Sequence, residues 1–117
     1  MKHIVYLTSE YPKKGLNGGG IGSFVQFLSR NLLKKGIKVS VIGINSNFDT
    51  VIENDNEITI YRLARSRRKL AKFYDHTNKI LKKINELDKE VPVDIVEGSE
   101  LNFSFFPKYT SYKKVIR

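Results

Sequence analysis

Short apolar runs alternate along the chain with longer amphipathic stretches. Residues 4–7 and 39–44 are rich in β-branched and aromatic side chains, and they predict two buried strands. Residues 58–63 alternate in the manner of a strand with one more buried face, and residues 93–97 and 113–117 predict two further strands. The polar residues 45–56 are interpreted as a loop with a short extended excursion at Val51 and Ile52.

Two of the longer stretches have the period of a helix with one buried face. The first begins near Ile21 and ends at Gly36, which follows two lysines that favour a helix C-terminus. Ser23 and Gln26 have the spacing of a capping box at its start. The second helix is predicted from about Ser66 to Glu90. Its expected apolar stripe consists of Leu70, Phe73, Thr77, Ile80, Leu81, Ile84 and Leu87.

The alternation of strands and helices determines the expected fold class. Strands joined by helical crossovers form a parallel sheet, and such a sheet needs helices on both faces. We therefore expect one α/β domain over residues 1–117, Rossmann-like and three-layered, with a mostly parallel sheet of about five strands. Since the last predicted strand has no helix after it, we expect the domain to be incomplete at its C-terminus.

Composition excludes several classes of site. No apolar stretch approaches the ~20 residues of a membrane span, and the N-terminus lacks the apolar region of a signal peptide, so a cytoplasmic protein is expected. The absence of cysteine excludes disulfides, thiolate metal sites and a cysteine nucleophile. His3 and His76 are too few and too far apart for an evident metal site, and we predict neither a metal nor a cofactor.

A formal net charge of +9 favours encounter with phosphates or anionic membranes. The candidate contacts with an anionic surface are Arg65, Arg67, Arg68, Lys69 and Lys72. Two interpretations stay open: a peripheral module that binds anionic lipid, with nucleic acid as the less favoured partner, or a solvated helix face.

A glycine-rich run, residues 18–25, lies between the first predicted strand and the first helix. Glycines allow a ligand close to the backbone, and the unpaired N–H groups of a helix N-terminus favour an anion, so the run is a candidate phosphate site. A surface loop that binds nothing is the alternative. Roughly ten residues separate Leu7 from Gly18, and no acidic residue ends the second strand, which argues against a dinucleotide fingerprint. A Walker A loop is excluded because no Gly-Lys-Ser/Thr follows.

Residues 4–12, 18–25 and 39–42, with Leu28, Leu32 and Gly36, resemble the opening of the N-terminal domain of retaining GT-B glycosyltransferases of the group-1 type. That group is similar in turn to glycogen and starch synthases, and residues 94–97 and 115–117 resemble later strands of the domain. The resemblance implies a hexosyltransferase with two Rossmann-like domains facing each other across a cleft. It also implies that the other domain holds most of a nucleotide-sugar donor, and that this domain holds a saccharide or lipid-linked acceptor.

The resemblance also implies site residues. It places the backbone amides of Gly19, Gly20, Ile21 and Gly22, and the Ser23 side chain, at the cleft between the domains. Glu10, Glu97 and Arg117 follow or end predicted strands, where ligands of such folds bind, although ordinary loop polarity is the alternative for each.

No position of this chain matches the family's histidine or its donor-binding glutamates. We therefore expect no catalytic residue here, and no sugar transfer by this chain alone. A nucleotide-binding Rossmann domain without transferase activity stays open as an alternative. Self-association through an unpaired strand edge is a further expectation.

Overall fold

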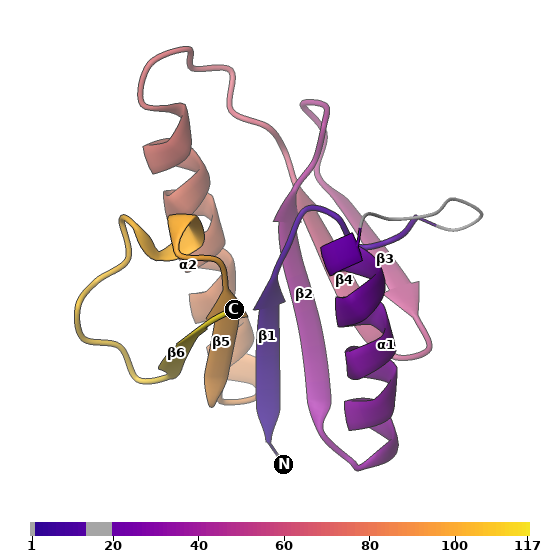
Figure 1. Cartoon of the computed structure of the whole chain (residues 1–117). Helices are drawn as coiled ribbons and strands as arrows, with labels where there is room; N and C mark the ends of the chain where they lie inside the picture. Colours follow the sequence, from indigo (N-terminus) through magenta and orange to yellow (C-terminus); the bar gives the residue numbers. More distant parts are fainter. Residues whose placement is uncertain (1, 14–19) are drawn as a thin grey trace.

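The computed structural model describes residues 2–13 and 20–117, and in these residues two helices enclose a six-stranded sheet (Figure 1). The elements in chain order are β1 (His3–Leu7), α1 (Gly20–Lys34), β2 (Lys38–Ile44), β3 (Val51–Asp55), β4 (Ile58–Leu63), α2 (Lys72–Glu90), β5 (Ile95–Gly98), the short 3-10 helix η1 (Leu101–Phe103) and β6 (Lys113–Ile116). The strand order is β3-β4-β2-β1-β5-β6, and every neighbouring pair is parallel except β3 with β4. The predicted α/β class and mostly parallel sheet are confirmed.

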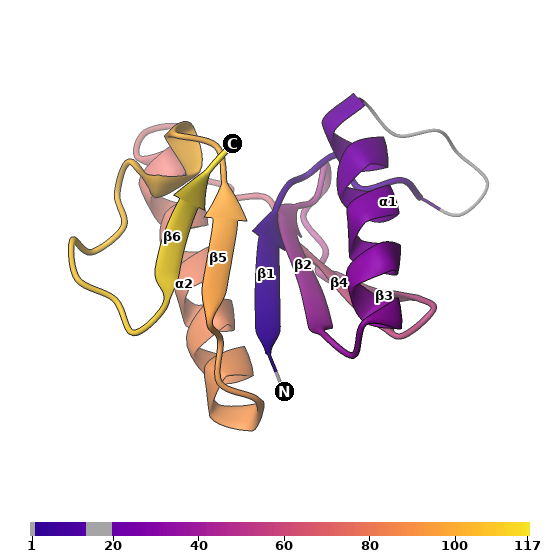
Figure 2. The same cartoon turned by 60° about the horizontal axis from the view of Figure 1, so that its bottom comes forward.

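Alternate residues of the central strands face two separate cores. Val5 packs in one core with Ile84 of α2, and Tyr6, the next residue of β1, packs in the other with Val25 of α1. Figure 2 shows α1 in front of the sheet and α2 behind it. This is the three-layer arrangement that apolar strands buried on both faces require.

The prediction of a loop over residues 45–56 is wrong in its second half, because β3 occupies Val51–Asp55. Val51 and Ile52 are exposed and no apolar alternation follows them, so the sequence carries little strand signal there. The strand forms by pairing with β4 across a tight turn at Asn56 and Glu57, which both have positive φ, as the twist of a two-residue hairpin requires. The sheet consequently has six strands instead of about five.

The second helix begins at Lys72, six residues later than predicted. Ser66 explains the difference, since its N–H donates to Nε2 of His76 (2.9 Å) and its hydroxyl oxygen accepts from the N–H of Arg68 (3.1 Å). These bonds hold the preceding segment as a loop. Leu70 and Phe73, expected in the buried stripe, are 87% and 61% exposed.

The capping box predicted for the first helix is also wrong. α1 begins at Gly20, so Ser23 lies inside the first turn and is not the cap. The side chain of Gln26 instead donates to Asp55 at the end of β3 (3.3 Å). Arg30 makes two further hydrogen bonds to the same carboxylate (2.9 and 3.2 Å), so α1 is fastened to β3 by polar contacts.

Tyr11 anchors the segment that leaves β1. Its hydroxyl donates to Asp55 (2.5 Å), and its backbone carbonyl accepts from the buried guanidinium of Arg62 (3.0 Å). Arg62 is also paired with Glu53 of β3. The chain after the carboxyl end of β1 is therefore held in a defined position at Tyr11.

Candidate functional site

A cavity of about 430 Å³ lies at the carboxyl ends of the parallel strands. Residues from five segments line it: those after β1 (Ser9), β2 (Asn45, Ser46) and β4 (Arg65), the first turns of α2 (Lys72, Phe73, His76), and the segment after β5 (Asn102, Phe105). Ligands of open α/β sheets bind at this edge, and the volume lies in the range of small-molecule sites. The cavity is therefore the candidate binding site.

Hydrogen bonds made by three of the lining residues hold the walls of this cavity. The Ser9 hydroxyl oxygen accepts from the N–H of Ile44 (3.0 Å), which ties the chain after β1 to the end of β2. The Asn45 amide donates to the Asp49 carbonyl (2.9 Å), and the Asn102 side-chain oxygen accepts from the N–H of Ser99 (2.8 Å). Within the part of the chain that the structure describes, the Ser9 hydroxyl donates no hydrogen bond, so its proton can be donated to a ligand.

Positive charge in the cavity comes from Arg65 and Lys72. His76 does not add to it, because Nε2 accepts the Ser66 N–H, which assigns the ring proton to Nδ1. Burial, together with the nearby ammonium of Lys79, lowers the pKa of His76, so the ring is neutral at pH 7. The cavity thus presents two cations, a neutral imidazole and the half-exposed ring of Phe105.

Within the described part of the glycine-rich run, residues 20–25, no residue lines this cavity. Gly19 is outside the described residues, whereas Gly20 and Ile21 are exposed in the first turn of α1 and Gly22 is buried. A Cβ on Gly22 would lie 1.7 Å from the Glu10 carbonyl oxygen, while a Cβ on Gly20 would meet no atom of the described residues within 4 Å. Close packing of α1 against the chain after β1 therefore explains Gly22, without any ligand.

The other predicted site residues fall into separate groups. Ser23 is exposed on α1, and Glu10 is exposed next to Ser9, a residue that lines the cavity. Among the basic candidates, Arg65 and Lys72 line the cavity, and the remaining three are exposed in the loop before α2: Arg67, Arg68 and Lys69.

Glu97 of β5 and Arg117, which follows β6, lie together on the side of β1 opposite β2. The Arg117 guanidinium is 3.9 Å from the Glu97 carboxylate and also donates to the Leu7 carbonyl (2.6 Å). Glu97 is level with Tyr6 in the sheet, and burial, together with this carboxylate, raises the pKa of Tyr6 to about 12. Neither Glu97 nor Arg117 lines the cavity, and their contacts join β5, β1 and the residue after β6 at one end of the sheet.

Sequence reasoning missed several lining residues. Asn45 follows β2 directly and Ser9 follows β1 after one residue, and this position alone is a signal that could have identified them. The sequence gives no such signal for His76 and Asn102, because they reach the cavity through the packing of α2 and η1.

Two classes of site find no support within residues 2–13 and 20–117. No cluster of three or more metal-ligating side chains occurs there. Neither of the helices described is both long enough and apolar enough to cross a bilayer.

Comparison with known proteins gives a structural match alone. No family model matches the sequence, and no curated protein matches it. The structure is similar to sucrose-phosphate synthase from Thermosynechococcus elongatus, with a TM-score of 0.63 and 13% sequence identity. The match covers 87% of this chain and 28% of the synthase, so the chain spans less than a third of that protein. The chain therefore shares its α/β fold with part of a sucrose-phosphate synthase.

Proposed function

We propose that this chain is the acceptor-binding domain of a glycosyltransferase with the GT-B architecture. The observation that supports this best is the cavity at the carboxyl edge of a sheet whose fold is similar to part of a sucrose-phosphate synthase. The resemblance of the first forty residues to group-1 enzymes points to the same class. In this proposal a second domain holds most of the nucleotide sugar, and this chain holds the acceptor.

The chemistry of the lining suits a carbohydrate. Ser9 and Ser46 offer hydroxyl groups that exchange hydrogen bonds with sugar hydroxyls, and the ring of Phe105 offers an apolar face to sugar C–H groups. Arg65 and Lys72 add charge-assisted bonds to an acceptor phosphate. We therefore assign these residues to binding and orientation of the acceptor.

The first turn of α1 has a separate role in the proposal. Its backbone N–H groups, at Gly20, Ile21 and Gly22, carry the positive end of the helix dipole. We propose that they stabilise charge developing on the diphosphate of the donor during transfer.

Titration of the ¹⁵N-labelled chain tests the acceptor role. Glucose, glucose 6-phosphate, UDP-glucose and inorganic phosphate are added separately at constant ionic strength, and backbone amide shifts are followed by NMR. We expect glucose 6-phosphate to shift the amides of Ser9, Ser46 and Asn102 more strongly than inorganic phosphate does. Shifts with none of the four, or shifts confined to the amino edge of the sheet, would refute the proposal.

A pair of matched variants separates site chemistry from net charge. Arg65→Ser with Lys72→Ser removes both cavity cations, and each charged hydrogen bond contributes about 1.5–3 kcal/mol, so glucose 6-phosphate binding should weaken at least tenfold. Arg67→Ser with Lys69→Ser removes the same charge outside the cavity and should leave the affinity within about twofold. Binding of UDP-glucose at α1 with no response to either sugar would instead favour a nucleotide-binding domain.

A further inference from the structure

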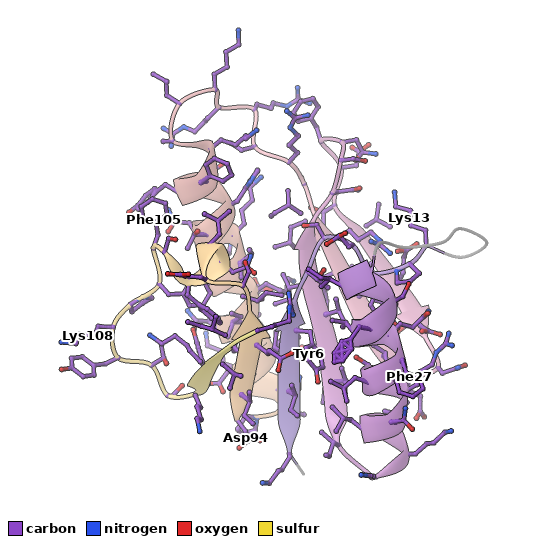
Figure 3. The ribbon with its side chains drawn as sticks, viewed as in Figure 1. Tyr6, Lys13, Phe27, Asp94, Phe105 and Lys108 are labelled. Atoms are coloured by element: carbon purple, nitrogen blue, oxygen red, sulfur yellow. The ribbon has the colours of Figure 1, made fainter. Side chains whose placement is uncertain are left out.

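The loop between β4 and α2, continued into the first turn of α2, extends beyond the sheet (Figure 1). We call residues 67–74 the tip. Its basic residues are Arg67, Arg68, Lys69 and Lys72, and its apolar residues are Leu70, Phe73 and Tyr74. Several side chains of this segment extend outward from the molecule (Figure 3).

The apolar side chains of the tip are exposed to an unusual degree. Leu70 is 87% exposed, and Phe73 and Tyr74 are 61% and 53% exposed. The Tyr74 ring contacts Phe105 edge to face, with 5.8 Å between ring centroids, so a fourth exposed apolar side chain extends the surface. A single exposed leucine needs no explanation, but a contiguous group of large apolar side chains at a protruding point indicates an interaction surface.

The cations of the tip are available for an anionic partner. Within the residues that the structure describes, Arg67, Arg68 and Lys69 form no salt bridge. The Arg67 guanidinium stacks on the ring of Phe48, 4.2 Å from its centroid, which orients the charge without neutralising it. The tip therefore combines unneutralised positive charge with exposed apolar area.

We propose that the tip docks on the surface of an anionic lipid bilayer. A membrane interface takes apolar side chains into the acyl boundary while lysine and arginine meet the phosphate headgroups. Nucleic acid would use the cations and stack on the aromatic rings, but it gives the aliphatic Leu70, the most exposed of these side chains, no partner. Charge and apolar character together thus favour lipid.

Docking has one consequence that rests on the proposed function. Lys72 and Phe73 belong both to the tip and to the lining of the cavity, so the cavity opens beside the docked surface. An acceptor whose sugar is attached to a membrane lipid would reach the cavity without leaving the bilayer. The docking itself does not depend on this.

Vesicle binding by the whole chain tests the proposal. The vesicles contain about one-third phosphatidylglycerol with phosphatidylcholine, or phosphatidylcholine alone, and the bound protein is measured by co-sedimentation. We expect binding to the anionic vesicles only, with loss of most of it when salt is raised from about 0.1 M to about 1 M. Absence of binding at low salt overturns the proposal.

A matched pair of triple variants assigns the binding to the tip. Arg67→Ser, Arg68→Ser and Lys69→Ser should lower the partition coefficient roughly 100-fold, because each basic residue near an anionic surface strengthens binding about fivefold. The control is Lys34→Ser, Lys35→Ser and Lys89→Ser, at the C-terminal ends of the helices, with the same change in net charge. It should bind within about threefold of the unmodified chain. Equal losses in both variants would show attraction by net charge alone and overturn the proposal.

A fluorescent reporter tests insertion of the apolar side chains. The chain contains no tryptophan, so Leu70→Trp introduces a single reporter at the tip, and Phe27→Trp places one at a similarly exposed position on α1. We expect vesicles to shift the emission of the Leu70 reporter to shorter wavelength, with quenching by brominated lipid, and to leave the Phe27 reporter unchanged. A response of the Phe27 reporter alone would refute docking by the tip.

Nucleic acid is distinguished in the same series. Tight, salt-sensitive binding of a single-stranded oligonucleotide, abolished by the triple variant at the tip, together with no binding to vesicles, would replace the lipid assignment. This outcome leaves the acceptor proposal intact, because Arg67, Arg68 and Lys69 do not line the cavity.

Discussion

Two glycines in the first turn of α1 should respond in opposite ways to the same substitution. At Gly22 a Cβ would lie 1.7 Å from the carbonyl oxygen of Glu10 and 2.4 Å from its carbonyl carbon. Both atoms belong to the backbone, so no side-chain rotation relieves the overlap, and α1 or the chain after β1 has to move. At Gly20 a Cβ would meet no atom of the described residues within 4 Å.

These distances set the size of the effect. Overpacking of a core costs about 1–3 kcal/mol. Because the two atoms that the new Cβ would overlap both belong to the Glu10 backbone, we expect Gly22→Ala to cost near the upper value of this range. Replacement of a helical glycine by alanine returns about 1 kcal/mol, so Gly22→Ala should destabilise the chain by about 2 kcal/mol. Gly20→Ala should be neutral or stabilise it by up to about 1 kcal/mol.

Thermal and urea unfolding of the two variants measure this difference. For a chain of 117 residues, 1 kcal/mol corresponds to about 4 °C, so Gly22→Ala should lower the midpoint by about 8 °C. Gly20→Ala should change the midpoint by no more than about 4 °C, and upward if at all. Equal stability of the two variants would refute the close packing of α1 on Glu10.

Three further predictions concern stability. The ring nitrogens of His3 contact the Val91 carbonyl and the Ser40 hydroxyl (2.8 Å each), and burial is the main cause that lowers the pKa of this ring. Because the unfolded chain then binds more protons than the folded chain, the free energy of unfolding should fall as pH drops below about 6.5. Urea midpoints between pH 7 and pH 5 measure this acid-side slope, and His3→Asn should reduce it. Tyr11→Phe removes the hydrogen bond to Asp55 and should cost about 1–2 kcal/mol in urea unfolding, so an unchanged midpoint would contradict an ordered contact. Ile84→Ala, at a fully buried position, should cost about 2–5 kcal/mol, whereas Leu70→Ala should stay within about 0.5 kcal/mol; similar losses would contradict the observed start of α2.

The sequence predicts those elements whose burial leaves a pattern of apolar residues. α1 was identified because its buried positions recur at helical intervals, and β2 because it is a short run of β-branched residues buried on both faces of the sheet. β3 was not predicted as a full strand, because its pairing with β4 is made by the backbone while Val51 and Ile52 are exposed. A strand stabilised at a sheet edge leaves little trace in the pattern of apolar residues.

The start of α2 shows a second limit. Leu70 and Phe73 fit the helical period, yet bonds made by Ser66 with His76 and Arg68 keep the chain before Lys72 out of the helix. Such contacts depend on side chains several residues away, and the spacing of apolar residues carries no information about them.

The cavity was predictable only in part. Its position at the carboxyl edge follows from the fold class, and Ser9 and Asn45 follow from the ends of their strands. Asn102 is distant from both in the sequence, and it joins the cavity because β5 pairs with β1 on the side opposite β2. The order of strands in the sheet is a tertiary property, so residues that depend on it are not found from local pattern.

The packing around Gly43 changes the interpretation of the glycine-rich run. A Cβ on Gly43 of β2 would lie 2.3 Å from the Thr8 carbonyl oxygen, so β2 approaches the chain after β1 from one side as Gly22 does from the other. Ser9, between these two contacts, is thereby held at the cavity. This packing explains why residue 22 is a glycine. Within the described part of the run, the hypothesis that backbone amides bind the donor diphosphate is therefore best tested at Gly20, where a side chain fits without strain. A ligand that approaches the backbone there would be displaced by Gly20→Val while the fold persists. Donor binding that survives this substitution would remove the proposed role of the first turn of α1 and leave the acceptor cavity untouched.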